Sequence, residues 1–302
     1  MEPQTYINQK VAGGNDIVFG EEHGSITSTF GLMEETIRQN PGRVQAVSVE
    51  FSPRLQPLIE QVAAGTLSAG DFTKLSRISN SQEYMEIAGG LLADGRISPE
   101  LHDTIIERSE NTIQAVLAGT TDESYPPELQ AQDVEVYGAL HSLIVTATGK
   151  GVPVVANDFG REGLLLNSVG AMTVGDLIER MDDTAGGDLL GSRADLSSSR
   201  SILVQRGSYH VWDLTYQDIP AVTNAGKGMD DYLQDKGRSV VVIGNYSSQD
   251  KLAGEVATLN NNGISITDAS DATILNGQLT ERPDLEIARR SLAPSSGGPS
   301  GP

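Results

Sequence analysis

Five short apolar runs, separated by segments with helical patterning, constrain the fold of this chain more than any other feature. The runs are rich in β-branched residues, and their apolar positions are closer to continuous than to alternating, which is typical of parallel strands covered on both faces. Strands that alternate with helices predict an α/β fold with a mostly parallel central sheet flanked by helices. The runs cover residues 17–19, 44–49, 152–156, 202–205 and 240–243.

Residues 51–151 separate the second run from the third and have helical patterns throughout. This segment is too long for a single crossover, so we expect a helical insertion packed over one end of the sheet, where it could act as a lid. Its clearest helix has one apolar stripe and is expected to stop at Gly65. We expect residues 1–290 to form one domain, and residues 291–302, rich in Pro, Gly and Ser, to be a disordered tail.

The charge balance excludes several classes of partner. The chain has 21 Lys and Arg against 41 Asp and Glu, so its formal net charge is −20. Polyanion binding needs a cluster of basic side chains, which the sequence lacks, and we therefore expect no nucleic-acid partner. No run approaches the roughly 18 apolar residues that a transmembrane helix needs. Cysteine is absent, which excludes disulfides, thiolate metal ligands and a cysteine nucleophile.

Polar and ionisable residues follow the ends of the first four runs. In an open α/β sheet, ligands bind outside the carboxyl ends of the strands. Because parallel strands bring these ends to one edge, we expect the side chains to converge on one site. In chain order they are Glu21, His23, Glu50, Asn157, Asp158, Arg206 and His210.

Two of these groups have the form Gly-x-x-His, at Gly20–His23 and Gly207–His210. Glycine permits a tight exit from a strand, and an imidazole three residues later can point back over the strand end. Two neutral imidazoles and a carboxylate, here His23, His210 and Glu50, are the ligand set of a catalytic divalent-metal site that keeps a position open for water. The same side chains could work without metal, with a histidine as general base on a water and a carboxylate orienting it.

The same residues also have structural interpretations. The histidine after the first run could cap the helix that follows. Glu50 could form an ion pair with Arg54 or Arg206, because a buried acid normally needs such a partner. Asp158 could close a turn with Gly160.

The segments IVFGEEHG, VSVEF, GVPVVAND and ILVQRGSYH resemble, in this order, the motifs of a superfamily that groups ChaN-like lipoproteins, erythromycin esterases and TIKI/TraB proteins, with the ChaN-like branch nearest. The resemblance covers about residues 15–245. It implies that Glu21, His23, Glu50 and His210 converge on one site. TIKI-like members look like metal-dependent peptidases with two G-x-x-H motifs, erythromycin esterases hydrolyse without a required metal, and ChaN-like members include haem binders.

The first function that this implies is hydrolysis of an ester or amide in a small-molecule or peptide substrate. The attacking water would be activated by the two histidines and Glu50, with or without Mn²⁺, Co²⁺ or Zn²⁺, and Glu21 would serve as metal ligand or base. Asp158 would orient a histidine, while Asn157 and Arg206 would bind the substrate, Arg206 through a carboxylate or an oxyanion.

The second function is a non-catalytic ligand-binding module on the same fold, for haem or for a host protein. Members of the superfamily also occur as domains of bacterial toxins and secreted effectors. The first ten residues lack the apolar segment of a secretory signal peptide. We therefore expect the protein to act in the cytoplasm or to be secreted into a host cell.

Overall fold

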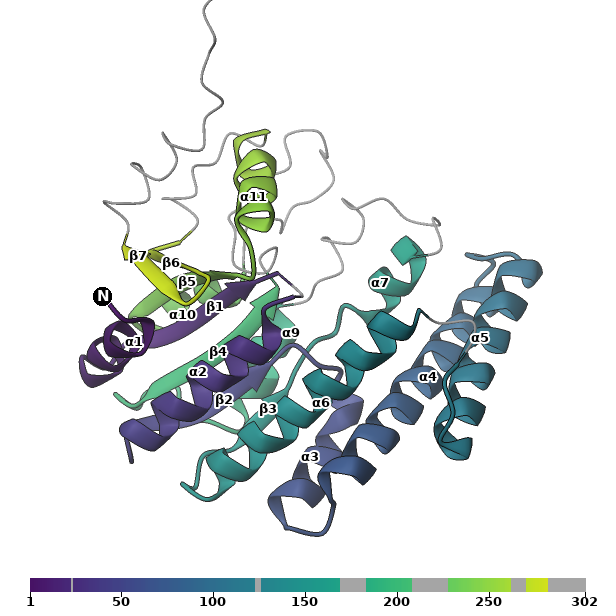
Figure 1. Cartoon of the computed structure of the whole chain (residues 1–302), viewed down its shortest axis with the longest axis horizontal. Coiled ribbons are helices and arrows are strands. Elements are labelled where there is room, and N and C mark those ends of the chain that lie inside the picture. The colour runs from purple at the N-terminus through teal and green to yellow at the C-terminus, as the bar shows by residue number, and fades with distance from the viewer. Residues whose placement is uncertain (23, 123–125, 169–182, 208–227, 262–269, 282–302) are drawn as a thin grey trace, which may run out of the picture.

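A seven-stranded sheet lies at the centre of the computed structural model, between layers of helices (Figure 1). The structure describes residues 1–22, 24–122, 126–168, 183–207, 228–261 and 270–281. The strands are β1 (Asp16–Glu21), β2 (Val44–Val49), β3 (Val154–Ala156), β4 (Ser201–Gly207), β5 (Val240–Tyr246), β6 (Ala272–Leu275) and β7 (Gln278–Glu281). Their order is β3-β2-β4-β1-β5-β6-β7, and every neighbouring pair is parallel except β6 and β7. The predicted α/β class and its mostly parallel sheet are confirmed.

Helices cover both faces of this sheet. The helices are α1 (Pro3–Ala12), α2 (Ile26–Gln39), η1 (Pro53–Leu55), α3 (Gln56–Ala63), α4 (Ala69–Ala93), α5 (Pro99–Ala118), α6 (Pro127–Thr148), α7 (Arg161–Ser168), α9 (Asp183–Gly191), α10 (Met229–Asp235) and α11 (Gln249–Asn261). Apolar residues of α1, α2, α3 and α6 form one core with the sheet, and those of α9, α10 and α11 form a second core on the opposite face. No helix in the described part of the chain is long and apolar enough to cross a membrane.

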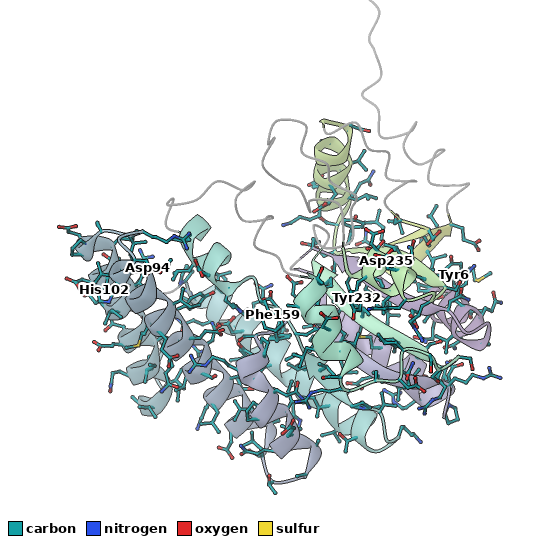
Figure 2. All side chains as sticks on the ribbon, turned by 180° about the vertical axis from the view of Figure 1, so that it is seen from behind. Tyr6, Asp94, His102, Phe159, Tyr232 and Asp235 are labelled. Atoms are coloured by element: carbon teal, nitrogen blue, oxygen red, sulfur yellow. The ribbon has the colours of Figure 1, made fainter. Side chains whose placement is uncertain are left out.

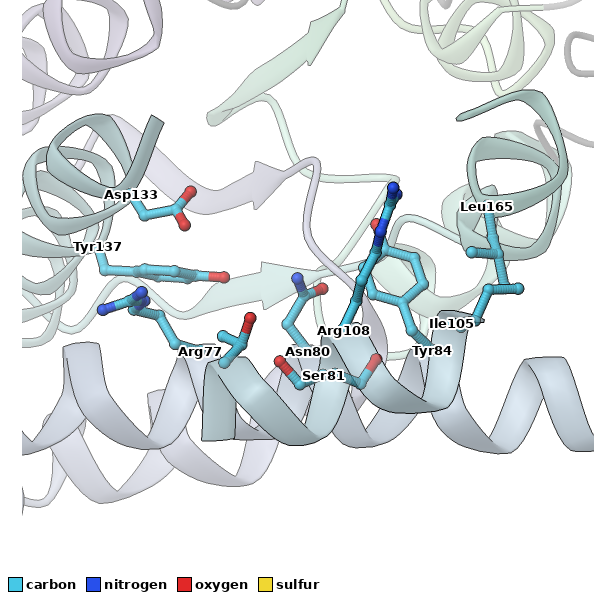
Figure 3. Close-up of a pocket in the computed structure, with 11 residues that line it drawn as sticks. Arg77, Asn80, Ser81, Tyr84, Ile105, Arg108, Asp133, Tyr137 and Leu165 are labelled. Carbon is cyan, nitrogen blue, oxygen red and sulfur yellow. The ribbon is translucent and has the colours of Figure 1, made fainter. Parts of the chain in front are cut away.

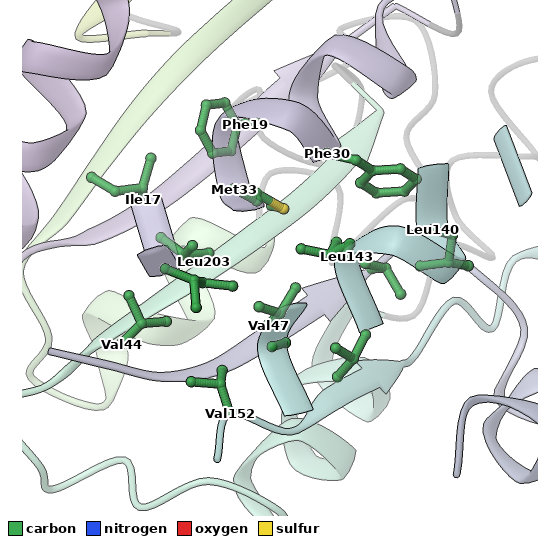
Figure 4. Close-up of a cluster of buried hydrophobic side chains, with 14 of the residues drawn as sticks. Ile17, Phe19, Phe30, Met33, Val44, Val47, Leu140, Leu143, Val152 and Leu203 are labelled. Atoms are coloured by element: carbon green, nitrogen blue, oxygen red, sulfur yellow. The ribbon is translucent and has the colours of Figure 1, made fainter. Parts of the chain in front are cut away.

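Strand alternation decides which side chains meet which core, because successive side chains point to opposite faces. Ile17 and Phe19 of β1 and Leu203 of β4 pack with α2 and α6 (Figure 4). Val18 and Val204, one position along, belong to the second core. The continuous apolar runs in the sequence therefore reflect strands buried on both faces.

The connection from β2 to β3 is the predicted helical insertion, which contains η1 and α3 to α6. Its last helix, α6, also serves as the crossover helix and packs on the sheet beside α2. Helices α4 and α5 pair with each other on the outside (Figure 1). A third apolar cluster joins α4, the turn before α5, α5 and α7 through Ala88, Leu91, Ile97, Ile105, Leu165 and Leu166. Helix α5 ends as its sequence predicts, at Gly119 in the left-handed conformation.

The hairpin of β6 and β7 at the sheet edge is not predicted by the apolar runs. Its turn is Asn276-Gly277, and both residues have positive φ, 49° and 74°. An Asn-Gly pair is the usual sequence of a two-residue hairpin turn with this geometry. The predicted tail at 291–302 lies outside the described residues, and the extent of a single domain over 1–290 stays a prediction.

A buried ion pair joins three strands at the amino-terminal edge of the sheet. The Arg238 guanidinium donates from Nε to Asp16 Oδ2 at 2.5 Å and from Nη2 to Asp16 Oδ1 at 2.7 Å. Asp16 Oδ1 also accepts the backbone N–H of Ile202 at 2.7 Å. Arg238 donates further to the carbonyls of Leu196, Ser198 and Arg200. The pair thus holds the starts of β1, β4 and β5 together.

Candidate functional site

Two glutamates meet at the carboxyl-terminal edge of the sheet. Glu21 is the last residue of β1 and is 1% exposed, and Glu50 directly follows β2. Strand β4 lies between β1 and β2 and supplies Gln205. Glu21 and Gln205 occupy the same alternation positions as Phe19 and Leu203, so they project from the α2 and α6 face of the sheet.

Gln205 connects the two glutamates by hydrogen bonds. Its Oε1 accepts the backbone N–H of Glu50 at 2.8 Å, and its Nε2 donates to Glu21 Oε1 at 3.0 Å. A backbone N–H can only donate, so the amide oxygen must face Glu50 and the amide NH₂ must face Glu21. The Glu50 carboxylate in turn accepts the backbone N–H of Gly207. Both acidic side chains are therefore held by β4.

A cavity of about 300 Å³ lies above these residues. It is closed by α4, α6 and α7 on the side away from the sheet, so the insertion forms its roof. The lining is rich in carboxylates, with Arg161 as the one basic side chain among the described lining residues. We call it the carboxylate cavity; it is lined by Glu21, Ile26, Glu50, Phe51, Asn80, Tyr84, Gln132, Asp133, Val136, Tyr137, Asp158, Arg161 and Gln205.

Burial raises the pKa of Glu21 well above its ordinary value. The nearby negative charges of Glu50 and Glu22 raise it further, while the hydrogen bond from Gln205 acts in the opposite direction. A carboxyl with such a shift holds its proton at a pH at which exposed glutamates are ionised. Perturbed carboxyl groups of this kind concentrate at functional sites.

Asp158 combines a structural role with a place in the cavity wall. Its Oδ1 accepts the N–H of Gly160 at 2.7 Å, so the predicted turn is confirmed. Its Oδ2 lies 3.7 Å from Nε of Arg161. Arg161 also donates to the hydroxyl of Tyr84 at 3.4 Å. Asp158 therefore keeps an arginine at the edge of the carboxylate cavity.

Asn157 and Arg206 lie together on the other face of the sheet and do not line the cavity. Arg206 is 1% exposed and donates to the Oδ1 and the carbonyl of Asn157. Asn157 Nδ2 donates to the carbonyl of Gly186 at 2.8 Å. A Cβ at position 186 would lie 2.6 Å from the Asn157 carbonyl oxygen, so only glycine permits this approach of α9. Their assignment as substrate contacts stays a prediction.

His23 and His210 lie outside the described residues, so their convergence with Glu50 stays a prediction. Among the residues that the structure describes, no three His, Cys, Asp or Glu side chains are grouped as a metal site would require. Arg54, one predicted partner of Glu50, forms its ion pair with Glu86 instead. The Glu50 side chain thus bonds to β4 rather than to that arginine.

The two histidines within the described residues take no part in the site. His102 is on α5 at the outer end of the insertion (Figure 2), and its Nδ1 lies 3.0 Å from Asp103 Oδ1. His141 is on α6, where its ring packs against Phe72 at a centroid distance of 6.0 Å. Both positions are those of structural residues.

Glu22, beside Glu21, faces α11 and joins β1 to that helix. Its carboxylate accepts hydrogen bonds from Ser247 and from the N–H of Gly24, and it lies 3.5 Å from Nζ of Lys251. Burial raises the pKa of Glu22, but these hydrogen bonds and Lys251 outweigh it, so the net shift is downward. The end of β1 therefore carries two acids with opposite pKa shifts on opposite faces.

A Glu255→Gln variant tests whether burial and the charge of Glu22 raise the pKa of Glu255 in the folded protein. Burial, and then the charge of Glu22, raise the pKa of Glu255 from 4.5 to about 7. A raised carboxyl pKa means that the folded state binds more protons, so this group makes stability fall as pH rises from about 4.5 to about 7. Urea unfolding at pH 5 and pH 8 should show a smaller loss of stability in Glu255→Gln than in the wild type. The exposed Glu110→Gln variant serves as control, and an unchanged pH dependence in Glu255→Gln would contradict the assignment.

Several residues of the site are missed by reasoning from strand ends. Gln205 is the last residue of an apolar run. The sequence feature that could have identified it is a polar residue at a strand position that is expected to face the core. Asp133 and Tyr137 come from α6, and Asn80 and Tyr84 from α4. Their helical spacing marks faces of helices but does not reveal that those faces meet above the sheet.

Comparison of the chain with protein-family models, with curated proteins and with solved structures finds no match. The resemblance to the superfamily of ChaN-like lipoproteins and erythromycin esterases therefore stays a prediction from the short motifs.

Proposed function

We propose that this protein is a hydrolase that activates a water molecule in the carboxylate cavity for attack on an ester or amide. The observation that carries the proposal is geometric. Glu21 ends β1 and Glu50 follows β2, on either side of β4. Gln205 of β4 bonds the Glu21 carboxyl group and the Glu50 backbone, Gly207 bonds the Glu50 carboxylate, and both acids line a cavity large enough for part of a small substrate. Paired carboxylates that line one cavity suit acid–base chemistry on water.

In the proposed reaction, the water oxygen attacks the carbonyl carbon while a carboxylate, Glu50, accepts one water proton. The bond to the leaving alcohol or amine then breaks, and that proton passes to the leaving oxygen or nitrogen. Gln205 acts as a positioning residue, because its amide holds Glu21 and the backbone of Glu50. Arg161, at the cavity wall, would bind the developing oxyanion.

A divalent metal is compatible with the donors on this edge of the sheet. The carboxylates of Glu21 and Glu50 are oxygen donors, and the resemblance adds His23 and His210. When bound there, Mn²⁺, Co²⁺ or Zn²⁺ would lower the pKa of a coordinated water. Haem binding, host-protein binding and a role as a secreted effector or toxin domain rest on the sequence resemblance alone and stay predictions.

A Glu50→Gln variant tests the proposal. Hydrolysis of p-nitrophenyl esters and of p-nitroanilide amides should fall about 100-fold or more, since a positioned acid–base group contributes at least this factor. The matched control is Glu60→Gln, which removes an exposed carboxylate of α3 that pairs with Arg193. Assays with a chelator and with added Mn²⁺, Co²⁺ or Zn²⁺ separate the metal-dependent from the metal-free reaction. Equal rates for Glu50→Gln and wild type would overturn the proposal.

A further inference from the structure

A second cavity of about 300 Å³ lies inside the helical insertion, among α4, α5, α6 and α7 (Figure 3). We call it the insertion pocket. It adjoins the carboxylate cavity, because the two share Asn80, Tyr84, Asp133 and Tyr137 in their walls. The insertion pocket is lined by Arg77, Asn80, Ser81, Tyr84, Ile105, Arg108, Ser109, Thr112, Asp133, Tyr137 and Leu165.

The helices present one face each to this pocket. Arg77, Ser81 and Tyr84 follow each other at intervals of four and three residues on α4, which places them on the same side of that helix. Ile105 and Arg108 are three residues apart on α5. The pocket is therefore built from regular helical positions.

The charge of the insertion pocket is opposite to that of its neighbour. It contains two arginines, Arg77 and Arg108, against one acid, Asp133. Neither arginine has a carboxylate within ion-pair distance among the described residues, although the charge of Arg77 acts on Asp133 at longer range. The one side-chain hydrogen bond of Arg77 is a long one, 3.5 Å, to Gln130. In Figure 3, Arg77 lies beside Tyr137 at one end of the pocket, and Arg108 lies beside Tyr84, apart from Arg77. Two cationic groups are thus available to an anionic ligand.

The rest of the wall combines apolar and aromatic side chains with the neutral polar side chains of Asn80, Ser81, Ser109 and Thr112. Ile105 and Leu165 are buried, at 4% and 6% exposure, and belong to the apolar cluster between the helices. The rings of Tyr84 and Tyr137 stand between the two cavities. An apolar or aromatic ligand body would gain from burial against these side chains.

We propose that the insertion pocket is a subsite for a carboxylate carried on an apolar or aromatic body, and that it sets substrate specificity for the proposed hydrolase. The scissile ester or amide would then reach past Tyr84 and Tyr137 into the carboxylate cavity. The negative end is disfavoured in that cavity, because the charges of Glu50 and Asp158 repel it. The opposite charges of the two cavities therefore orient such a substrate in one direction.

Binding of 3-phenylpropionate, measured by calorimetry, tests the subsite without any turnover. Its neutral amide, 3-phenylpropionamide, has the same shape and serves as the ligand control. The wild type should bind the carboxylate at millimolar concentrations and bind the amide at least tenfold more weakly. Arg108→Gln should weaken carboxylate binding about tenfold, because a charged hydrogen-bond partner is lost. Arg108 is exposed, so its replacement leaves the fold intact.

Further variants locate the binding site. Arg77→Gln should have an effect similar to that of Arg108→Gln, whereas Arg38→Gln, which removes an exposed arginine from α2, should bind as the wild type does. Glu50→Gln should bind the carboxylate at least as tightly as the wild type, so the test is independent of the hydrolytic activity. Equal affinity for acid and amide, no binding of the acid, or unchanged binding in both Arg77→Gln and Arg108→Gln would each overturn the subsite. Loss of hydrolysis alone would instead concern the proposed function.

Discussion

A Glu21→Gln variant is expected to lose hydrolytic activity and, at pH 8, to be more stable than the wild type. Glutamine has nearly the same shape as glutamate, and its side-chain oxygen can still accept the hydrogen bond from Gln205. The ionised form of Glu21, by contrast, is disfavoured by burial and by the charges of Glu50 and Glu22. The substitution removes these unfavourable interactions of the ionised carboxylate, together with one carboxyl group of the proposed site.

The direction of this stability change follows from proton linkage. The pKa of Glu21 in the folded state lies well above the ordinary value of 4.5, so the folded state binds more protons than the unfolded state above that pH. The free energy of unfolding of the wild type must then fall as pH rises from about 4.5 through the folded-state pKa. The Gln variant lacks this contribution. At pH 4, where the carboxyl is protonated in both states, the two proteins should be nearly equally stable.

Urea unfolding at pH 4 and pH 8, together with ester hydrolysis, measures both effects. We expect the gain in stability at pH 8 to be about 0.5–2 kcal/mol, the range typical of single stabilising substitutions. Activity should fall about 100-fold or more. Gain of stability with loss of activity is the signature of a residue retained for function. A variant that is inactive and destabilised at pH 8 would instead mark Glu21 as a structural residue.

Asp16→Ala is expected to have the largest effect on folding, a loss of about 3–5 kcal/mol, because it leaves the buried positive charge of Arg238 without its carboxylate. The Asp16 carboxylate receives two hydrogen bonds from this guanidinium and one from the Ile202 N–H. All three bonds are lost together at the edge where β1, β4 and β5 start. Unfolding in urea at pH 7 measures the change.

Two controls separate a buried charge from a generic salt-bridge effect. Glu86→Ala breaks the exposed pair with Arg54 and should leave stability nearly unchanged, because solvent screens exposed ion pairs. The double variant Asp16→Leu/Arg238→Met replaces both charges by apolar groups and should recover part of the loss. If Asp16→Ala costs no more than Glu86→Ala, the ion pair does not hold the strands together.

The strands could be predicted from the sequence because β-branched runs buried on both faces leave a continuous apolar pattern. The approach of Glu21 and Glu50 to one edge follows from parallel pairing alone. Their link through Gln205 does not, because it depends on β4 lying between β1 and β2. The sequence contains no local signal for the order of strands in the sheet, because that order is set by the packing of the long connections between strands.

The cavities were beyond sequence reasoning for a related reason. Arg77 and Arg108 look like ordinary charged positions on helical faces, and only the packing of α4 against α5 makes them line one pocket. The β6–β7 hairpin, in contrast, carries a local signal in Asn276-Gly277. Asn157 follows the end of β3 as predicted, whereas Arg206 lies within β4, and the side chains of both are on the other face of the sheet.

Helix α6 belongs at once to the ligand cavities and to the main core. Asp133 and Tyr137 line the cavities, while Leu140, Leu143 and Ile144 further along are fully buried against the sheet. Displacing the helix would expose side chains whose burial stabilises the protein by roughly 1.5–3 kcal/mol each. Under the proposed function, substitutions on α4 and α5 are therefore expected to change substrate preference, while the core contacts of α6 keep the position of that helix fixed.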